Sequence, residues 1–349
     1  MVTRVVGLDI GRDVVRAVEV ENPEKSKPLA VRFAEASLPP DSVRSGEVRE
    51  VNTVATALRK LWATGGFKTR NVVIGIGNQR VLARDLTVPK MSLVQIRESL
   101  PFQVQEMLPV PVSEALLDYY PVSEGTAEQG PVVNGLLIAA IKEAVMGNVN
   151  AVRAAGLTPL NVDLLPFALA RALARGQFSR GMLAFIDIGA STTNVVITSG
   201  AVPQFVRMIP GGGEDITRAL VNALEIHPQE AERFKRTLGL GGDGAYTEAD
   251  IRALEVIRAS ANELLTSLRN TLNYYTNTHQ GESLQGIVLS GGGARLGGIA
   301  QALGSFVRVP AMLADPFSGV DMAKGLRDRS REELFAATVP LGLAIGGVA

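Results

Sequence analysis

One pattern occurs twice in this sequence, and it limits the possible folds more than any other feature. Each copy is an apolar strand, an Asp-Ile-Gly turn and a second apolar strand, which read VVGLDIGRDVVRAV and LAFIDIGASTTNVVIT. Asp9 in the first copy corresponds to Asp187 in the second, and Gly11 corresponds to Gly189. The copies are separated by roughly half of the 349 residues. A unit repeated at that distance predicts two related halves that each begin with the same β-hairpin.

The composition favours a well-packed protein and excludes several classes of function. Hydrophobic residues make up 46% of the chain and charged residues 20%, which supplies enough apolar surface for a buried core. The 35 Lys and Arg balance the 35 Asp and Glu, so we expect no broad basic face for nucleic acid. The chain has no cysteine and only two histidines. Disulfides and thiolate zinc sites are therefore excluded, and a Ser-His-Asp triad is disfavoured.

No segment predicts export or a membrane span. The apolar run at the start is too short for a signal peptide, and the longest charge-free stretch is 334–349. That stretch falls short of the ~20 apolar residues that cross a bilayer. We therefore expect a soluble, cytoplasmic chain that does not insert into the membrane directly.

Apolar periodicity predicts the other elements. In the first half we expect helices at 51–64, 92–108, 142–155 and 165–175, strands at 71–76, 81–86 and 132–141, and a polar loop at 125–130. In the second half we expect strands at 202–209 and 287–289, and helices at 214–224, 228–238, 246–279 and 295–303.

Three glycine-bearing turns follow predicted strands and form a candidate site for phosphate groups. They lie at 9–13, 187–193 and 290–294. Glycine lets backbone N–H groups approach a phosphate without interference from a Cβ atom. Asp9 and Asp187 can hold Mg²⁺ directly or through water, because Mg²⁺ favours carboxylate, water and phosphate oxygens. One such turn is usually only a hairpin, but three in this order on a duplicated frame favour phosphate binding.

Other motifs give no competing site. The run at 239–244 matches G-x-G-x-x-G, but it follows a helical pattern rather than a strand, so we interpret it as a loop. The chain contains no G-x-x-x-x-G-K-[ST] and no G-x-S-x-G. A P-loop nucleotidase is therefore excluded, and no nucleophile elbow is present.

The order of the three turns resembles that of the actin, Hsp70 and sugar-kinase ATPase superfamily. GLDIGRDVVRAVEV resembles its phosphate-1 motif, FIDIGASTTNVVI its phosphate-2 motif and IVLSGGGARLGGI its adenosine motif. VDLLPFALARAL and ATVPLGLAIGG resemble its two connecting helices, and AERFK resembles the A-E-x-x-K helix that contacts adenosine in bacterial actins. The resemblance implies an ATP-binding cleft between the two halves, with Mg²⁺ held by Asp9 and Asp187. The nucleotide contacts that it implies are Asp9, Gly11, Arg12, Asp187, Gly189, Ser191, Thr192, Thr193, Gly212, Gly213, Glu232, Lys235, Gly291, Gly292, Gly293 and Arg295.

Within this superfamily the chain resembles the PilM family, the cytoplasmic actin-like proteins of type IV pilus assembly. The segment QIRESLPFQVQEMLPVPVSEALLDYYPV is similar to the start of that family's inserted subdomain. The resemblance implies an α/β, actin-like (ribonuclease H-like duplicated) fold with an FtsA/PilM-type insert. The implied parts are a first core at 1–87, 158–181 and 335–349 (1A), an insert at 88–157 (1C), a second core at 182–210 and 285–334 (2A) and a small lobe at 211–284 (2B).

The sequence departs from the superfamily pattern at two positions. The phosphate-1 turn usually continues with hydroxyl residues, whereas this chain has Arg12 and Asp13. Arg12 either reaches the phosphate itself or points to solvent. Bacterial actins that hydrolyse ATP have a Glu before the proline of the first connecting helix, where this chain has Leu165, with Asp163 two residues earlier. Leucine cannot orient or deprotonate water, so any ATPase activity is expected to be slow and no catalytic residue is assigned.

The resemblance also implies a function and partners. The chain is expected to be an ATP-binding scaffold that holds the N-terminal cytoplasmic segment of the membrane protein PilN in a groove beside the insert. It would thereby lie at the inner membrane and link that complex to cytoplasmic motor ATPases, and self-association stays open. The insert residues that either form this groove or its own core are Phe102, Val104, Met107, Leu108, Leu116 and Tyr119.

Two alternatives share the same frame. A filament-forming division protein like FtsA would end in an amphipathic membrane helix, whereas this chain ends in LGLAIGGVA. A small-molecule kinase would need a base for an acceptor hydroxyl, for which Asp187 is the candidate.

Overall fold

The computed structural model describes residues 2–346 except for residues 243 and 280–282. Residues 347–349 of the expected first core and residues 243 and 280–282 of the expected small lobe therefore lie outside the described residues, as does part of the glycine run at 239–244.

The two predicted hairpins are present and have the same turn geometry. Strands β1 (Arg4–Ile10) and β2 (Val14–Glu21) are antiparallel, as are β11 (Met182–Ile188) and β12 (Thr192–Ser199). In the first turn the Gly11 amide donates to the Val14 carbonyl at 3.0 Å, and in the second the Gly189 amide donates to the Thr192 carbonyl at 3.0 Å. The repeat seen in the sequence is thus a repeat in structure.

Each hairpin begins a sheet, and the two sheets share one topology. The first sheet has the order β10-β6-β1-β2-β3-β16 and the second has the order β13-β12-β11-β14-β15. In both, the first strand has an antiparallel meander on one side and, on the other, a parallel neighbour that pairs in turn with a second parallel strand. The first sheet has β16 as an additional edge strand. This duplication confirms the predicted α/β, actin-like fold class. The additional strands are β3 (Leu29–Ser37), β6 (Asn71–Ile76), β10 (Thr158–Leu164), β13 (Val202–Pro210), β14 (Gly286–Ser290), β15 (Ala311–Leu313) and the short hairpin β4 (Val43–Arg44) and β5 (Glu47–Val48).

Helices cover both faces of the first sheet because its strands alternate apolar residues on each side. On one face, Val6 and Leu8 of β1 belong to a core cluster with Leu58 of α1 (Val51–Gly65). Helix α3 (Lys142–Ala154) packs on α1. On the other face, α4 (Leu165–Leu173) and α11 (Thr338–Gly346) pack together on β1 and β6. Helix α4 also contacts β11 and β12, so it lies between the two sheets.

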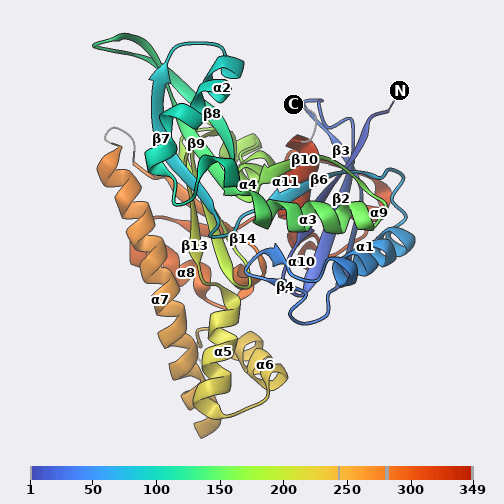
Figure 1. Ribbon diagram of the computed structural model, residues 1–349. Coiled ribbons are helices and arrows are strands. Elements are labelled where there is room, and N and C mark those ends of the chain that lie inside the picture. The colour runs from blue at the N-terminus through green and yellow to red at the C-terminus, as the bar shows by residue number, and fades with distance from the viewer. Residues whose placement is uncertain (1, 243, 280–282, 347–349) are drawn as a thin grey trace.

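The insert is a three-stranded sheet with its own apolar centre. Strands β7 (Val81–Pro89), β8 (Ala115–Ala127) and β9 (Gly130–Ile141) have the order β7-β9-β8, and α2 (Leu93–Gln103) packs on them at the top of the molecule (Figure 1). The polar loop expected at 125–130 is wrong, because β8 continues to Ala127 and pairs with β9 along that stretch. The core of the insert is formed by Val88, Ile96, Leu100, Val104, Tyr119, Val133 and Leu137.

The insert residues proposed for a partner groove divide between core and surface. Val104 and Tyr119 are buried, and the Tyr119 hydroxyl lies 2.9 Å from the carbonyl oxygens of Leu86 and Val133. Met107 and Leu108 are partly buried against the same core. Phe102 and Leu116 are exposed, with 87% and 41% of their surface accessible.

The small lobe is helical and lies at the opposite end of the molecule from the insert (Figure 1). It contains α5 (Gly213–Leu224), α6 (Pro228–Leu238) and the first part of α7 (Glu248–Thr278). Helix α7 begins at a Thr247–Asp250 capping box and runs along the side of the second sheet up to the insert. Among the described residues no helix has both the length and the apolar character needed to cross a membrane.

The chain returns to the first half earlier than the expected boundary at 334/335. Helix α8 (Ile299–Val307) still packs on β15 of the second sheet. Strand β16 (Asp321–Met322) instead pairs with β3 of the first sheet, and Phe317 packs in one cluster with Phe33. The segment from about 317 to 334 therefore belongs to the first core, because it covers the apolar edge of the first sheet. The remaining helices there are α9 (Lys324–Arg327) and α10 (Arg331–Phe335).

Candidate functional site

Two carboxyl groups lie at equivalent positions in the two hairpins. Asp9 is the penultimate residue of β1 and pairs with Arg16, and Asp187 is the penultimate residue of β11 and pairs with Asn194. Burial raises the pKa of Asp9, although the Arg16 guanidinium 3.9 Å away opposes this. Burial and then the facing Asp9 carboxylate raise the pKa of Asp187 to about 7, against the attraction of Arg16. The two carboxyl groups therefore form a pair that a cation would stabilise.

The donor set fits Mg²⁺ only together with a phosphate ligand. No group of three or more His, Asp or Glu side chains among the described residues can hold a metal ion. Mg²⁺ in nucleotide sites takes one or two carboxylates, and water and phosphate oxygens complete its octahedron. Asp9 and Asp187 match that requirement and would hold the ion when nucleotide is bound.

The glycine turns of the second half approach one another too closely for side chains. The Gly213 amide donates to the Gly189 carbonyl at 2.9 Å. A Cβ atom on Gly212 would lie 2.4 Å from that same carbonyl oxygen. Gly291 has φ of 85°, and a Cβ there would lie 2.4 Å from the Ile188 carbonyl oxygen. Glycine is required at positions 212 and 291 because the backbone at each lies against that of the second hairpin.

The three hydroxyl residues of the second turn have different environments. The Thr193 hydroxyl donates to the Gly211 carbonyl at 2.9 Å, so its proton holds the next turn in place. Thr192 Oγ1 is buried and has no hydrogen-bond partner among the described residues. Ser191 lines the open side of the cleft. An unpartnered buried hydroxyl beside a glycine turn is consistent with a ligand site.

Glu232 and Lys235 of α6 connect to the first turn of α5. Lys235 Nζ lies 2.6 Å from Glu232 Oε2 and donates to the Gly213 carbonyl at 2.9 Å. It also donates to Thr217 Oγ1 at 2.8 Å. Burial would raise the pKa of Glu232, but hydrogen bonds from Lys235, Arg236 and Thr217 together lower it. A Cβ on Gly213 would lie 3.8 Å from Lys235 Nζ and 3.5 Å from Gly293 Cα, so this lysine is next to two of the glycine turns.

Two arginines of the predicted site form ion pairs between the halves. Arg12 Nη1 lies 2.5 Å from Glu214 Oε1 at the start of α5. Arg295 Nη2 lies 3.6 Å from Glu332 Oε2 of α10. The structure thus brings the second-half turns at Gly189, Gly213 and Gly293 together, and of the predicted site residues Arg12 and Ser191 line the cavity between the halves. The Arg295 side chain instead contacts the first half at Glu332.

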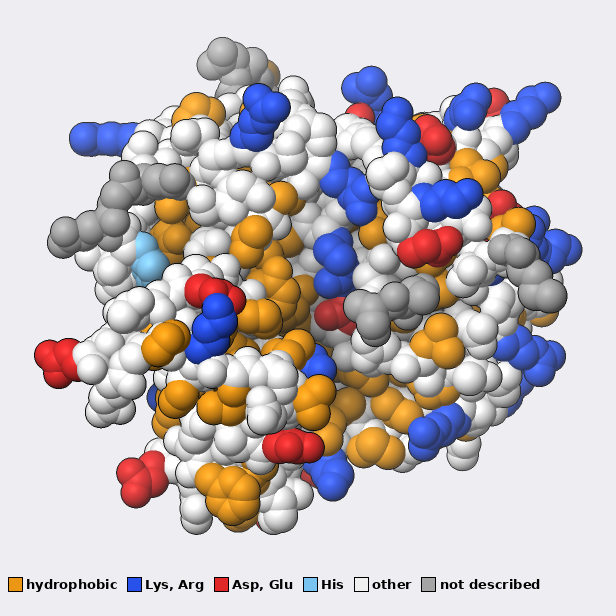
Figure 2. Space-filling model, turned by 90° about the horizontal axis from the view of Figure 1, so that it is seen from above, with side chains coloured by type: hydrophobic (Ala, Val, Ile, Leu, Met, Phe, Trp, Pro, Cys, Tyr) orange, Lys and Arg blue, Asp and Glu red, His pale blue; other side chains and the backbone are white. Residues whose placement is uncertain are grey.

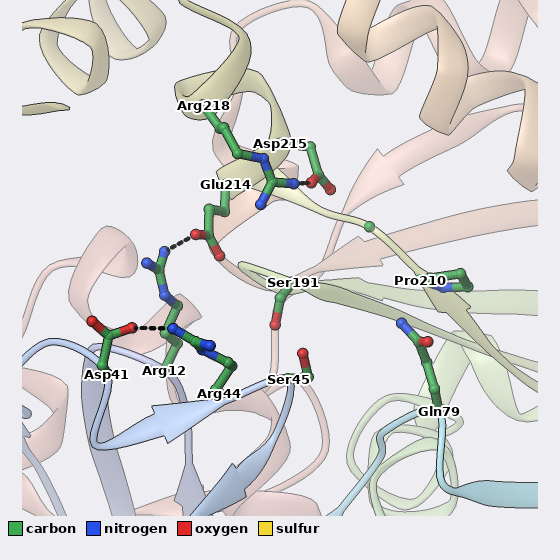
Figure 3. A pocket seen from close by; sticks show the side chains of 11 residues that line it. Arg12, Asp41, Arg44, Ser45, Gln79, Ser191, Pro210, Glu214, Asp215 and Arg218 are labelled. Atoms are coloured by element: carbon green, nitrogen blue, oxygen red, sulfur yellow. Dashed lines mark hydrogen bonds and ion pairs between the residues drawn. The ribbon is translucent and has the colours of Figure 1, made fainter. Parts of the chain in front are cut away.

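A cavity of about 600 Å³ opens between the halves beside the Arg12–Glu214 pair (Figure 3). Side chains from the first half face α5 and the second hairpin across it. Sequence reasoning missed most of these residues, because they come from loops that approach one another only after folding. The lining residues are Arg12, Asp41, Arg44, Ser45, Gln79, Ser191, Pro210, Gly211, Glu214, Asp215 and Arg218.

Leu165 and Asp163 have structural contacts. Leu165 packs on β6, where a Cβ on Gly75 would lie 2.2 Å from its Cδ2. Asp163 accepts hydrogen bonds from the Arg171 guanidinium and from the Leu164 amide. The Asp163 carboxylate is therefore already bound within the first half, and Leu165 supplies no polar group to the cleft.

A second hollow of about 340 Å³ lies between β8 of the insert, α4 and the start of β13. Tyr120 of β8 and Phe167 of α4 form one wall, with ring centroids 4.7 Å apart. Burial lowers the pKa of Arg171 to about 10, Tyr120 opposes that shift, and Arg175 adds to it. The other lining residues are Ala170, Ala174, Arg175, Ala201 and Pro203. On the face in Figure 2, hydrophobic side chains also gather around a hollow near the middle of the molecule. We name the space between β8 and α4 the insert groove.

Comparison with known proteins identifies similar chains. The family model described as type IV pilus assembly protein PilM matches residues 7–348. A solved PilM-PilN type IV pilus biogenesis complex contains a chain with 30% sequence identity and a TM-score of 0.85, covering 99% of this chain and 98% of that one.

More distant similarities concern the fold. The cell division protein FtsA of Bacillus subtilis is 22% identical over 89% of this chain and 78% of its own length. MreB 5 of Spiroplasma citri, in a structure bound to AMPPNP, has 13% identity and a TM-score of 0.52, covering 97% of this chain and 94% of that one.

Proposed function

The chain belongs to the type IV pilus assembly protein PilM family, and we propose that it is a nucleotide-binding scaffold of pilus assembly that holds a PilN-type peptide. Two parts of the molecule support this. The cleft between the halves has the chemistry of a nucleotide site, and the insert groove has the chemistry of a site for an apolar peptide. Through the peptide the scaffold lies at the inner face of the membrane, and it links that complex to the cytoplasmic motor ATPases.

ATP binds in the cleft between the two hairpins. The Gly11 and Gly189 amides already donate within their own turns, so the other backbone amides of these two turns receive the phosphates. The base and ribose lie toward Lys235 and the turns at Gly213 and Gly293, which the packing brings together. The fold is the same as that of the MreB 5 structure bound to AMPPNP.

Mg²⁺ accompanies the nucleotide, held by Asp9 and Asp187 through direct or water-mediated contacts. Burial and then the Asp9 carboxylate raise the pKa of Asp187 to about 7, and a bound cation would offset both effects. Because the first connecting helix presents Leu165 in place of an acid, the nucleotide acts mainly as a ligand that selects the conformation of the cleft.

The insert groove takes the N-terminal segment of the PilN-type partner. Its walls are aromatic and aliphatic, which suits apolar side chains of an extended peptide. Arg171 and Arg175 provide guanidinium donors at the groove for backbone carbonyls of the peptide. The solved PilM-PilN complex, with which this chain aligns over 99% of its length, supports a partner of this kind.

Helix α4 gives the two sites a physical connection. Its first residue, Leu165, packs on β6 just before the loop that carries Gln79 of the cleft. Its later turns, from Phe167 to Ala174, form the floor of the insert groove. Closure of the cleft that moves α4 therefore changes the width of the groove.

The observation that most supports the peptide assignment is the contact between the Tyr120 and Phe167 rings in the insert groove. Removing the Tyr120 ring tests the assignment. Tyr120→Ala should weaken binding of a PilN-type N-terminal peptide at least tenfold in calorimetry, because an aromatic contact surface is lost. Tyr274→Ala is the matched control, since Tyr274 is half-exposed on α7 and is not among the residues that line the groove. Equal affinities for the two variants would show that the peptide binds elsewhere.

A further inference from the structure

The Arg12–Glu214 pair occupies an unusual position for a surface ion pair. Arg12 lies in the turn of the first hairpin, where the superfamily pattern has hydroxyl residues, and Glu214 lies in the first turn of α5 in the other half. Their side chains are 31% and 21% exposed, and their closest atoms are 2.5 Å apart. The pair therefore spans the cleft at the place where the two halves face each other (Figure 3).

Glu214 is held firmly in this position. Its amide donates to the Ala190 carbonyl at 2.9 Å, which ties the start of α5 to the second hairpin. Asp215 accepts from the Gly212 amide at 2.8 Å and fixes the same helix end. A carboxylate in the first turn of a helix is further stabilised by the helix dipole. Glu214 is thus a fixed anion next to the turns that surround the proposed phosphate site.

We propose that Arg12 senses the terminal phosphate of a nucleoside triphosphate, and that Glu214 is the anion with which this phosphate competes. The inference rests on the proposed nucleotide site. Without nucleotide, Arg12 holds Glu214 and the cleft stays closed by this contact. When a triphosphate binds, its terminal phosphate replaces Glu214 as the partner of the Arg12 guanidinium. The negative charge of that phosphate is then repelled by the Glu214 carboxylate.

The chemistry of the groups supports this exchange. A guanidinium binds carboxylate and phosphate with the same fork of donors, so Glu214 and a phosphate compete for one surface of Arg12. Lys235 contacts Gly213 of the second half, so in the proposed orientation the base lies on that side and the last phosphate is directed at the first hairpin. A diphosphate consequently leaves the Arg12–Glu214 contact intact. The Arg12–Glu214 pair therefore distinguishes triphosphate from diphosphate. A turn with hydroxyl residues at this position has no guanidinium for Glu214 and a phosphate to compete for.

The test compares two neutralised acids. Glu214→Gln removes the nearest competing anion and leaves Arg12 with the exposed Asp13 carboxylate 3.9 Å away, so affinity for a non-hydrolysable ATP analogue should rise about tenfold while affinity for ADP changes less than twofold. Glu230→Gln is the matched control. Glu230 is a half-exposed acid of the same lobe that pairs with Arg233 at 3.7 Å, and its substitution should change neither affinity. Arg12→Gln should lower affinity for the ATP analogue about tenfold and leave ADP unchanged.

A second readout requires no nucleotide. The chain has no cysteine, so Asn52→Cys and Asn222→Cys place one spin label on an exposed site of each half. The nucleotide-free parent should give one narrow distance, and Glu214→Gln should broaden and lengthen it while Glu230→Gln leaves it unchanged.

The outcomes separate the two proposals. If the parent binds neither nucleotide, both the proposed function and this inference are wrong. If the parent binds both but Glu214→Gln leaves the ATP-to-ADP affinity ratio unchanged, the inference alone is overturned. An unchanged spin-label distance in Glu214→Gln overturns the closing role of the pair. A raised ratio together with a widened distance supports the proposal.

Discussion

Replacing Asp187 by Asn should stabilise the nucleotide-free protein, and the gain should depend on pH. Burial and the facing Asp9 raise the pKa of Asp187 from 3.8 to about 7. A carboxyl group with a raised pKa in the folded state lowers stability as pH increases from its unfolded pKa to its folded pKa. Asn is nearly isosteric with the protonated acid, so the variant avoids that loss.

The size of the expected gain in stability follows from the shift in the pKa of Asp187. Each pKa unit corresponds to about 1.4 kcal/mol, so a shift from 3.8 to about 7 sets an upper limit of about 4 kcal/mol at high pH. Arg16 and residual solvent reduce this value, because Asp187 is only partly buried. We expect Asp187→Asn to gain about 2 kcal/mol at pH 8.5 and less than about 1 kcal/mol at pH 4.5.

Urea unfolding at the two pH values measures this gain. Asp13→Asn is the control, because Asp13 is an exposed acid in the first hairpin turn and should change stability by less than about 0.5 kcal/mol at either pH. The same Asp187 variant should lose the Mg²⁺-dependent part of ATP binding. A gain that is equal at both pH values, or a loss of stability, would show that Asp187 serves local backbone hydrogen bonds instead of forming a strained carboxyl pair.

Three further predictions follow from the cleft. Lys235→Glu should weaken ATP binding at least tenfold in calorimetry, because a cation beside Gly213 becomes an anion; unchanged affinity would contradict the adenosine-side assignment. Gly212→Ala should lower unfolding free energy by about 1–3 kcal/mol, because its Cβ would lie 2.4 Å from a carbonyl oxygen; chemical denaturation checks this, and an unchanged midpoint would refute it. Steady-state phosphate release should stay below ~1 s⁻¹, because Leu165 cannot activate water, and rapid turnover by pure protein would exclude this view.

The parts of the fold that could be predicted have strong local signals. The two hairpins combine apolar β-branched strands with a glycine turn, and both are present with equivalent turn hydrogen bonds. The helix expected at 92–108 is present as α2, which begins at a Ser92–Gln95 capping box and ends at Gln103. Such signals are local, so one sequence suffices to find them.

The missed features depend on tertiary contacts. The second half of β8 contains Pro121 and Gly125, which predict a loop, yet cross-strand pairing with β9 extends the strand and places the irregularity at Pro121. The segment at 317–334 has a two-residue strand and very short helices, so no periodicity marks its return to the first sheet. The sequence placed Arg12 in the site but could not place Glu214 opposite it, because 201 intervening residues bring them together only by folding.

The most direct measurement of the central proposal is crosslinking of a photoreactive PilN-type N-terminal peptide to the full chain, followed by mapping of the labelled residues. The account predicts labels on β8 and on α4 around the insert groove, and it predicts that replacing the apolar residues of the peptide abolishes them. Labels confined to the small lobe at 211–284 would contradict the groove assignment even if the peptide binds tightly.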